Sequence, residues 1–365
     1  MAGSFIILTF GVVVLYFIFL VTYRLFFSPI AGVPGSKLAA ATGWYEAYFD
    51  VALGGQFVFK IEEWHKKYGP IVRVNPWEVH ISDPDFYDVY FSTRSKHSKF
   101  KPWQKRFGLP LSTFDAIHHE EHNRRRQAVA PFFTRQRVLD YIPFIQKCVD
   151  RMCNRIEQEY RNTSKTLCLD EVFSSLTSDV ITYYSFALFY DFLGMPDFKS
   201  PFTLGARRLA LSVHVSGHIP GFLWLMQSLP RSWVAVINPS MKHVFDFHGE
   251  LRNQIQRIMN GEHKNNPSQS SVYPTVFSDL MESNLRPEEK TVDLFFHEAG
   301  IIVGAGIETT KAALTIASFH VLANPSTKHR LQKELREAMP EPLSAPLTLA
   351  QLEKLPYLHG VVQEC

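Results

Sequence analysis

Glu308 and Thr309 directly follow an apolar run in this chain of 365 residues. The run, Ala299–Ile307 (AGIIVGAGI), has no charge on any face, so we expect a helix that is buried all round. Burying an unpaired carboxylate is costly, so Glu308 should have either a partner or a chemical task. The alternative is that Glu308 and Thr309 begin a solvated turn, because most charged residues on helices lie at the surface.

Gly304 and Gly306 stand inside the same run. Each glycine destabilises a helix interior by up to about 1 kcal/mol relative to alanine. Small residues at these positions would let a flat, bulky group approach the backbone, or let the helix open locally.

A second polar cluster covers residues 118–126 (HHEEHNRRR). His122 and Arg126 are four residues apart and would share one helix face. His118, Glu121 and His122 also fit the H-x-x-E-H pattern of inverted zinc peptidases. We disfavour zinc, because short patterns of common residues arise by chance and the following arginines would oppose a dication. A charged, solvated helix start is the remaining alternative.

Several stretches together resemble the cytochrome P450 monooxygenase family. Gly304–Thr310 (GAGIETT) resembles its oxygen-activating helix, and His122, Arg126 and the following Pro131–Phe133 match a second motif. Trp64–Arg73 (WHKKYGPIVR) and Leu355–Leu358 (LPYL) extend the likeness in the correct order. The N-terminal part most resembles ascomycete secondary-metabolism enzymes of the trichodiene-oxygenase type.

The resemblance implies a role for each of these residues. Thr309 would hold the hydrogen bond through which protons reach activated oxygen, and Glu308 would feed that relay. Heme would be the cofactor, with His122 and Arg126 at its propionates and Ala305 and Gly306 on the helix beside it. The implied partners are a membrane, an NADPH-cytochrome reductase and a small apolar substrate, terpenoid or polyketide.

The family's later motifs set a limit on this expectation. Its Glu-x-x-Arg motif begins at Glu364, and the sequence given ends one residue later, before the arginine and the cysteine loop. We therefore expect a truncated scaffold that is inactive as it stands. Two alternatives stay open: a non-catalytic membrane-anchored binding protein, and an active enzyme with a prematurely ended gene model.

None of the four cysteines fits the heme-ligand loop of the family or a zinc-ligand spacing, so no metal ligand is expected among them. Cys148 and Cys153 lie in a predicted amphipathic helix, and Cys168 precedes another helix. Few cysteines in a chain of this length favour a reducing compartment and inert thiols.

The N-terminal residues predict a membrane anchor. Met1–Tyr23 has no charged residue, and Phe5–Val21 is long enough to cross a bilayer core of roughly 30 Å. A cleaved signal peptide would have a basic start and a shorter apolar region, which this segment lacks. Arg24 and Lys37 follow, so we expect a single-pass protein of the endoplasmic reticulum whose body faces the cytosol.

The expected fold is mainly α with a small β-sheet, that is, an incomplete cytochrome P450-like fold. We divide the chain into an anchor (1–27), a Pro/Gly hinge leading into the body (28–55) and a truncated P450-like domain (56–365). The periodicity predicts two short strands and a set of helices, with a polar linker over 261–274. The helices are expected over 57–68, from 83–84, and over 119–138, 142–160, 170–189, 287–322, 325–339 and from 355.

The composition also excludes one class of partner. The formal net charge is only +3, which is too small to indicate a nucleic-acid-binding protein.

Overall fold

The computed structural model describes residues 2–92, 96–261, 275–339 and 347–364. The predicted linker over 261–274 therefore lies almost wholly outside the described residues. The chain divides into two compact units. The first unit is 1–110 with 115–121 and 208–230, and the second is 111–114 with 122–207 and 231–365.

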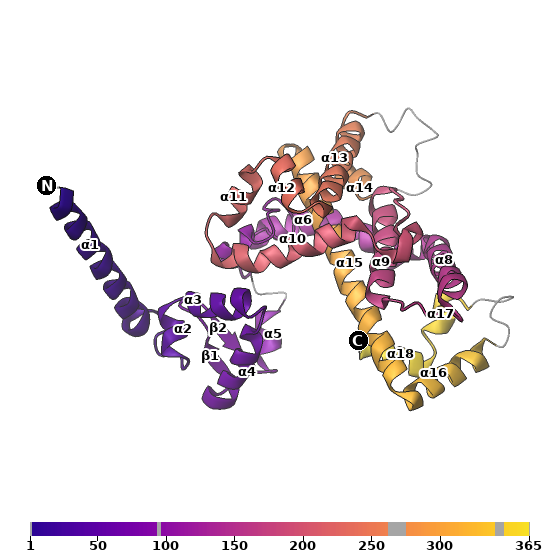
Figure 1. Ribbon diagram of the computed structural model, residues 1–365, viewed down its shortest axis with the longest axis horizontal. Helices are drawn as coiled ribbons and strands as arrows, with labels where there is room; N and C mark the ends of the chain where they lie inside the picture. The colour runs from indigo at the N-terminus through magenta and orange to yellow at the C-terminus, as the bar shows by residue number, and fades with distance from the viewer. Residues whose placement is uncertain (1, 93–95, 262–274, 340–346, 365) are drawn as a thin grey trace. The chain divides into compact units, whose positions relative to one another are not determined.

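The first unit contains short helices and the only sheet among the described residues (Figure 1). Its strands, β1 (Ile71–Arg73) and β2 (Val79–Ile81), pair antiparallel with Val72 opposite His80. Its helices are α1 (Ala2–Thr22), η1 (Tyr23–Phe27), α2 (Lys37–Ala41), α3 (Trp44–Ala47), η2 (Tyr48–Ala52), α4 (Phe57–Tyr68), α5 (Phe86–Tyr90), η3 (Lys101–Lys105) and α11 (Phe222–Ser228).

Local sequence explains where these elements begin and end. The side chain of Ser36 accepts a hydrogen bond from the Ala39 N–H and so caps α2. Gly69 ends α4 with φ of +100°, a backbone conformation that disfavours other residues. The small core of the first unit is formed by Ala39, Phe57, Trp64, Val72 and Val74.

The second unit is helical and is built around α9 (Leu169–Phe186) and the long α15 (Val292–Ala323), which lie side by side (Figure 1). α6 (His119–Val129) and α10 (Pro201–His218) contribute residues to both units. The other helices are η4 (Ala130–Phe133), α7 (Arg135–Asp140), α8 (Ile142–Tyr160), η5 (Phe192–Gly194), η6 (Pro196–Phe198), α12 (Arg231–Ile237), α13 (Ser240–Met259), α14 (Val276–Glu282), η8 (Pro287–Glu289), α16 (Pro325–Ala338), α17 (Leu349–Leu352) and α18 (Pro356–Gln363).

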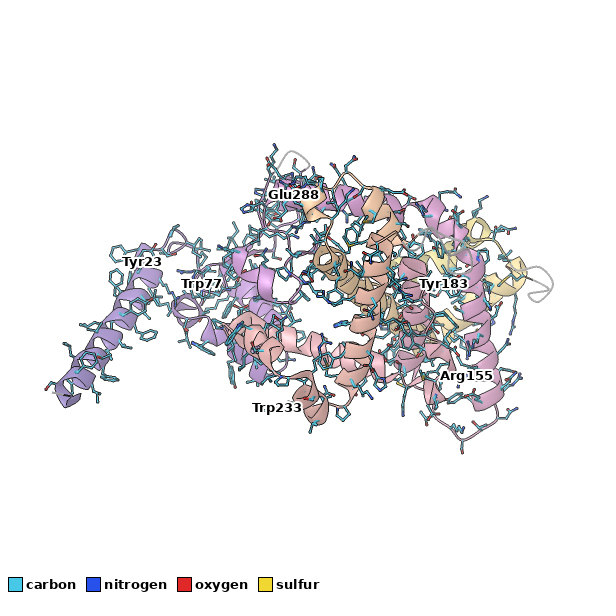
Figure 2. All side chains as sticks on the ribbon, turned by 90° about the horizontal axis from the view of Figure 1, so that it is seen from above. Tyr23, Trp77, Arg155, Tyr183, Trp233 and Glu288 are labelled. Atoms are coloured by element: carbon cyan, nitrogen blue, oxygen red, sulfur yellow. The ribbon has the colours of Figure 1, made fainter. Side chains whose placement is uncertain are left out.

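Aromatic and cationic side chains of α8 contact α9 and the segment that follows α9. The ring of Phe144 in α8 stacks on Tyr183 of α9, with centroids 3.9 Å apart. Arg155, also in α8, donates to the carbonyl oxygen of Met195 at 3.1 Å and lies over the ring of Phe198. Figure 2 labels Arg155 and Tyr183 on these two helices. These contacts help to position α9, the helix that packs against α15.

The mainly helical fold with a small sheet is confirmed, but several predicted boundaries are wrong. The helix predicted over 119–138 ends at Val129, because Pro131 lacks an N–H and a 3-10 turn intervenes before α7. The helix predicted from Pro287 begins at Val292, where Thr291 caps it by accepting from the Leu294 N–H. α9 ends at Phe186, because Ala187 adopts the left-handed conformation.

Two other expectations meet the structure differently. The segment 28–55, expected as a hinge, carries the short helices α2, α3 and η2 after its prolines. The helix expected from Asp83–Pro84 begins at Phe86, because the Asp83 carboxylate accepts the Asp85 N–H and forms a turn first.

Among the described residues, two helices are long and apolar enough to cross a membrane. One is Ser4–Phe27, none of which is buried inside the structure. The other is α15, whose residues instead supply much of the core of the second unit. The N-terminal apolar helix that the sequence predicts is therefore present.

Candidate functional site

One face of α15 is open although the helix lies in the core. Ile302, Val303 and Ile307 are buried, whereas Gly304, Ala305 and Thr309 are exposed. We call Gly304, Ala305 and Thr309 the open face of α15. A core helix that leaves small residues uncovered offers a surface against which a flat group could lie.

The two glycines of this run have different surroundings. A Cβ atom added to Gly304 would meet nothing within 4 Å. A Cβ atom added to Gly306 would stand 2.7 Å from Cγ1 of Ile181 in α9. Gly306, predicted to lie beside a cofactor, is thus explained by the close approach of α9 to α15. Only Gly304 leaves open space.

Thr309 and Glu308 both have hydrogen-bond partners within the helix. The Thr309 hydroxyl donates to the carbonyl oxygen of Ala305 at 2.7 Å. The Glu308 carboxylate accepts from Nζ of Lys311 at 2.7 Å, and this buried lysine also lies 3.6 Å from Asp170. Glu308 therefore has the partner that its position demanded, and α15 continues through both residues without a solvated turn.

The arginines of α6 separate into two roles. Arg124 donates twice to Glu289 at 2.8 Å, and these bonds chiefly lower the pKa of Glu289 to about 2. Arg125 is buried, 3.8 Å from Glu289 and 3.5 Å from the carbonyl oxygen of Ser112. Arg126 is exposed and His122 is half-buried. Of the three arginines, only Arg126 presents its charge at the surface of the second unit.

The zinc pattern at the start of α6 does not form a three-ligand group. His118 precedes the helix, which begins at His119, so it does not share a helix face with His122. In the described ranges, the only trio of potential ligands with atoms within 4.8 Å of one another lies elsewhere, at Glu46, Asp50 and His218.

Sequence reasoning missed a buried carboxylate about two turns before the open face. Glu298 in α15 is 2% exposed and accepts from both the N–H and the hydroxyl of Thr113 at 2.5 Å. Burial raises its pKa, while the bonds from Thr113 and the charge of Arg125 oppose the rise. The neighbouring His297 accepts from the Leu111 N–H at 3.1 Å. The segment 111–114 is thus fixed to α15 about two turns before the open face, and a lone Glu directly before an apolar run was the available signal.

The three described cysteines are free thiols. Cys148 is buried in α8, where burial raises its pKa to about 11, and burial also raises the pKa of Cys153. Raised thiol pKa values disfavour the thiolate that binds metals. Cys365 lies outside the described residues.

Comparison with known proteins identifies the relatives of this chain. A family model described as Cytochrome P450 matches residues 45–365. Cytochrome P450 monooxygenase orf6 of Eupenicillium brefeldianum is 41% identical over 351 residues, covering 96% of this chain and 69% of the relative.

Other relatives are also fungal monooxygenases. Cytochrome P450 monooxygenase MO6277 of Ascocoryne sarcoides is 38% identical over 97% of this chain and 70% of its own length. Cytochrome P450 monooxygenase TRI4 of Fusarium sporotrichioides is 34% identical over 96% of this chain and 66% of its own length. The family resemblance drawn from the sequence motifs is confirmed.

Proposed function

Because this chain belongs to the cytochrome P450 family, we propose that it forms part of a heme-dependent monooxygenase of secondary metabolism. The substrate class is a small apolar molecule, terpenoid or polyketide. The open face of α15 is the observation that carries the proposal, because it places Thr309 and two small residues on an uncovered face of a core helix.

The residues present fit one side of a heme. Gly304 and Ala305 leave room for a flat ring, and a Cβ atom at Gly304 would touch nothing within 4 Å. Arg126, exposed on α6, and His122 would hold the propionates, since a guanidinium forms strong charge-assisted bonds with carboxylates. When bound, heme supplies the iron at which dioxygen is reduced and split.

No cysteine in the described part of the chain fits as the thiolate that would bind the heme iron. Cys148 is buried with a raised pKa, and Cys153 and Cys168 lie outside any heme-ligand motif. Thiolate ligation is what favours cleavage of the oxygen–oxygen bond in this family. We therefore propose that residues 1–365 by themselves are inactive as a monooxygenase.

Thr309 would hold a proton at the reacting face. Its hydroxyl is oriented by the bond to the Ala305 carbonyl oxygen, which leaves the oxygen lone pairs of Thr309 free to accept a proton donor. Glu308 would resupply this site only after leaving its ion pair with Lys311. The relay role of Glu308 thus requires a side-chain movement that the role of Thr309 does not.

The N-terminal helix would fasten the enzyme to a membrane. Ser4–Phe27 has the length and hydropathy of a membrane span, and Arg24 and Lys37 lie on the side expected to face the cytosol. We place the protein in the endoplasmic reticulum, where an NADPH-cytochrome reductase would deliver the two electrons that each turnover consumes. With two protons taken up as well, one oxygen atom of dioxygen would enter the substrate and the other would leave as water.

The test uses a fusion of residues 1–365 to the C-terminal part of the Eupenicillium brefeldianum orf6 relative, here called the extended enzyme. It is expressed in yeast with a reductase and supplied with terpenoid and polyketide test substrates. We expect products heavier by one oxygen atom from the extended enzyme and none from residues 1–365. Binding of the same substrates without oxidation by the extended enzyme would instead support a non-catalytic, membrane-anchored binding protein.

A further inference from the structure

Three potential metal ligands converge in the first unit. Glu46 in α3 and Asp50 in η2 are one helical turn apart, and His218 is the last residue of α10. One ligand atom from each lies within 4.8 Å of the others. The closest pair is Nε2 of His218 and Oδ2 of Asp50, 3.1 Å apart, with the two side chains only 8% and 17% exposed.

A buried amide orients the first of these ligands. Asn75 is 2% exposed, and its Nδ2 donates to Oε2 of Glu46 at 2.9 Å. The Oδ1 of Asn75 accepts the N–H groups of Trp77 and Glu78, at 2.9 and 2.8 Å, which fixes the amide in turn. Carboxylates that bind metals are commonly held by such a hydrogen bond on the oxygen or edge turned away from the ion.

We propose that Glu46, Asp50 and His218 form a binding site for one divalent transition-metal ion, with Zn²⁺ as the best match. One imidazole and two carboxylates suit zinc, whereas calcium and magnesium prefer ligand sets made of oxygen alone. The proposal does not depend on the monooxygenase function, because no residue of the open face takes part.

The spacing of the ligands agrees with this ion. Zinc binds nitrogen and oxygen at about 2.0–2.2 Å, so neighbouring ligands in a tetrahedral site stand about 3.3–3.6 Å apart. The His218–Asp50 separation of 3.1 Å is close to that value. A ligand atom of Glu46 lies within 4.8 Å of ligand atoms of both other residues.

The charges of the cluster also favour a cation. The carboxylates of Asp50 and Glu78 lie close enough to Glu46 to interact with its charge. A dication would compensate these negative charges, and histidine binds metals through a neutral imidazole. The competing explanation is a simple ion pair between protonated His218 and Asp50.

The test measures Zn²⁺ binding by the whole chain, purified in detergent after treatment with a chelator. A chromophoric chelator competes for the metal at about pH 7, where histidine is largely neutral. We expect one saturable site that Asp50→Asn and His218→Gln each weaken at least about tenfold, since each removes a ligand. The matched control is His80→Gln, because His80 and His65 form a separate histidine pair in the same unit, 2.7 Å apart.

Two further measurements distinguish loss of the site from misfolding of a variant and from metal binding by thiols. Zn²⁺ should raise the unfolding temperature of the wild type and of His80→Gln, but not that of Asp50→Asn. Substitution with Co²⁺ should give the weak absorption of nitrogen and oxygen ligands. The proposal is overturned by the absence of a saturable site, by wild-type affinity in Asp50→Asn, by loss of binding in His80→Gln, or by an intense thiolate band.

Discussion

At the scale of single residues, the neighbours Thr309 and Thr310 provide a matched pair. Both are exposed on α15, but only the Thr309 hydroxyl is tied to the Ala305 carbonyl oxygen on the open face. In the extended enzyme, Thr309→Ala should leave heme binding nearly intact and uncouple oxygen consumption from product formation. General acid–base roles are worth roughly 10²–10⁴-fold in rate.

The measurement compares oxygen consumed with product formed for both threonine variants. Thr310→Ala should couple as the wild type does. Unchanged coupling in Thr309→Ala would mean that Glu308 and Thr309 are an ordinary helix surface, and the assignment of the site would be lost.

In the extended enzyme, Arg126→Ala should weaken heme retention, whereas Thr309→Ala should leave heme binding nearly intact. Removing a charge-assisted bond of about 1.5–3 kcal/mol predicts roughly ten- to a hundredfold faster heme loss, measured by transfer to a heme-free acceptor protein. Arg126→Lys should recover part of the retention, and Gln127→Ala, an exposed neighbour on α6, should behave as the wild type. Equal heme loss from Arg126→Ala and Gln127→Ala would exclude Arg126 as a propionate ligand.

The sequence indicated candidate site residues that are close together in the chain. It did not indicate residues that pair over long sequence distances. Glu308–Thr309 and His122–Arg126 are recognisable because their spacing is local. The Thr113–Glu298 bond joins residues 185 positions apart, and the Arg124–Glu289 pair joins residues 165 positions apart. No local pattern specifies such partners, because tertiary packing chooses them.

At the scale of elements, the two glycines of α15 have different surroundings: Gly306 packs against α9, whereas Gly304 faces open space. Gly306→Ala would place a Cβ atom 2.7 Å from Ile181, a β-branched and stiff side chain, and overpacking of this kind costs about 1–3 kcal/mol. Gly304→Ala meets nothing within 4 Å and should stabilise the helix by up to about 1 kcal/mol.

Denaturant unfolding of the chain in detergent checks this pair. Gly306→Ala should cost less in an Ile181→Ala background than in the wild type, because the side chain that causes the clash is then absent. If Gly306→Ala proved as stable as Gly304→Ala, the close approach of α9 and α15 would be wrong.

A buried carboxylate in the middle of α9 predicts a pH dependence of stability. Asp179 is fully buried and accepts the N–H groups of Phe192 and Leu193 at 2.9 Å. Burial raises its pKa from 3.8 to about 6, against the effect of these bonds, with Asp191 raising it and Arg151 lowering it. Because the folded state holds the proton more tightly, the stabilisation is present at low pH and is lost as the pH rises through about 6.

The comparison is between the wild type and Asp179→Asn, which cannot titrate. The free energy of unfolding of the wild type, relative to the variant, should fall by about 3 kcal/mol between about pH 4 and pH 7. A difference that is the same at both pH values would show that folding does not raise the pKa of Asp179.

The boundaries of some elements were predicted well. α4 and α8 have the predicted bounds, and the two strands lie where the alternation placed them. The errors at 129–134 and 287–291 come from prolines that start short 3-10 turns, where the sequence suggested continuous helices. Sequence periodicity does not distinguish a short 3-10 turn from the start of a continuous helix, because both can begin at a proline.

At the scale of the whole molecule, the likeness to fungal monooxygenases covers 96% of the chain and includes both units. The central claim is that residues 1–365 supply the oxygen-facing side of a heme site but not its thiolate ligand. The open face and Arg126 support the first part, and the surroundings of the described cysteines support the second.

The most direct test is the absorption spectrum after heme loading, reduction and addition of carbon monoxide, recorded for residues 1–365 and for the extended enzyme. The account predicts a thiolate-type band from the extended enzyme and none from residues 1–365. A thiolate-type band from residues 1–365 alone would contradict it by making one of their own cysteines the ligand, and its absence from a folded extended enzyme would show that the open face is not a heme site.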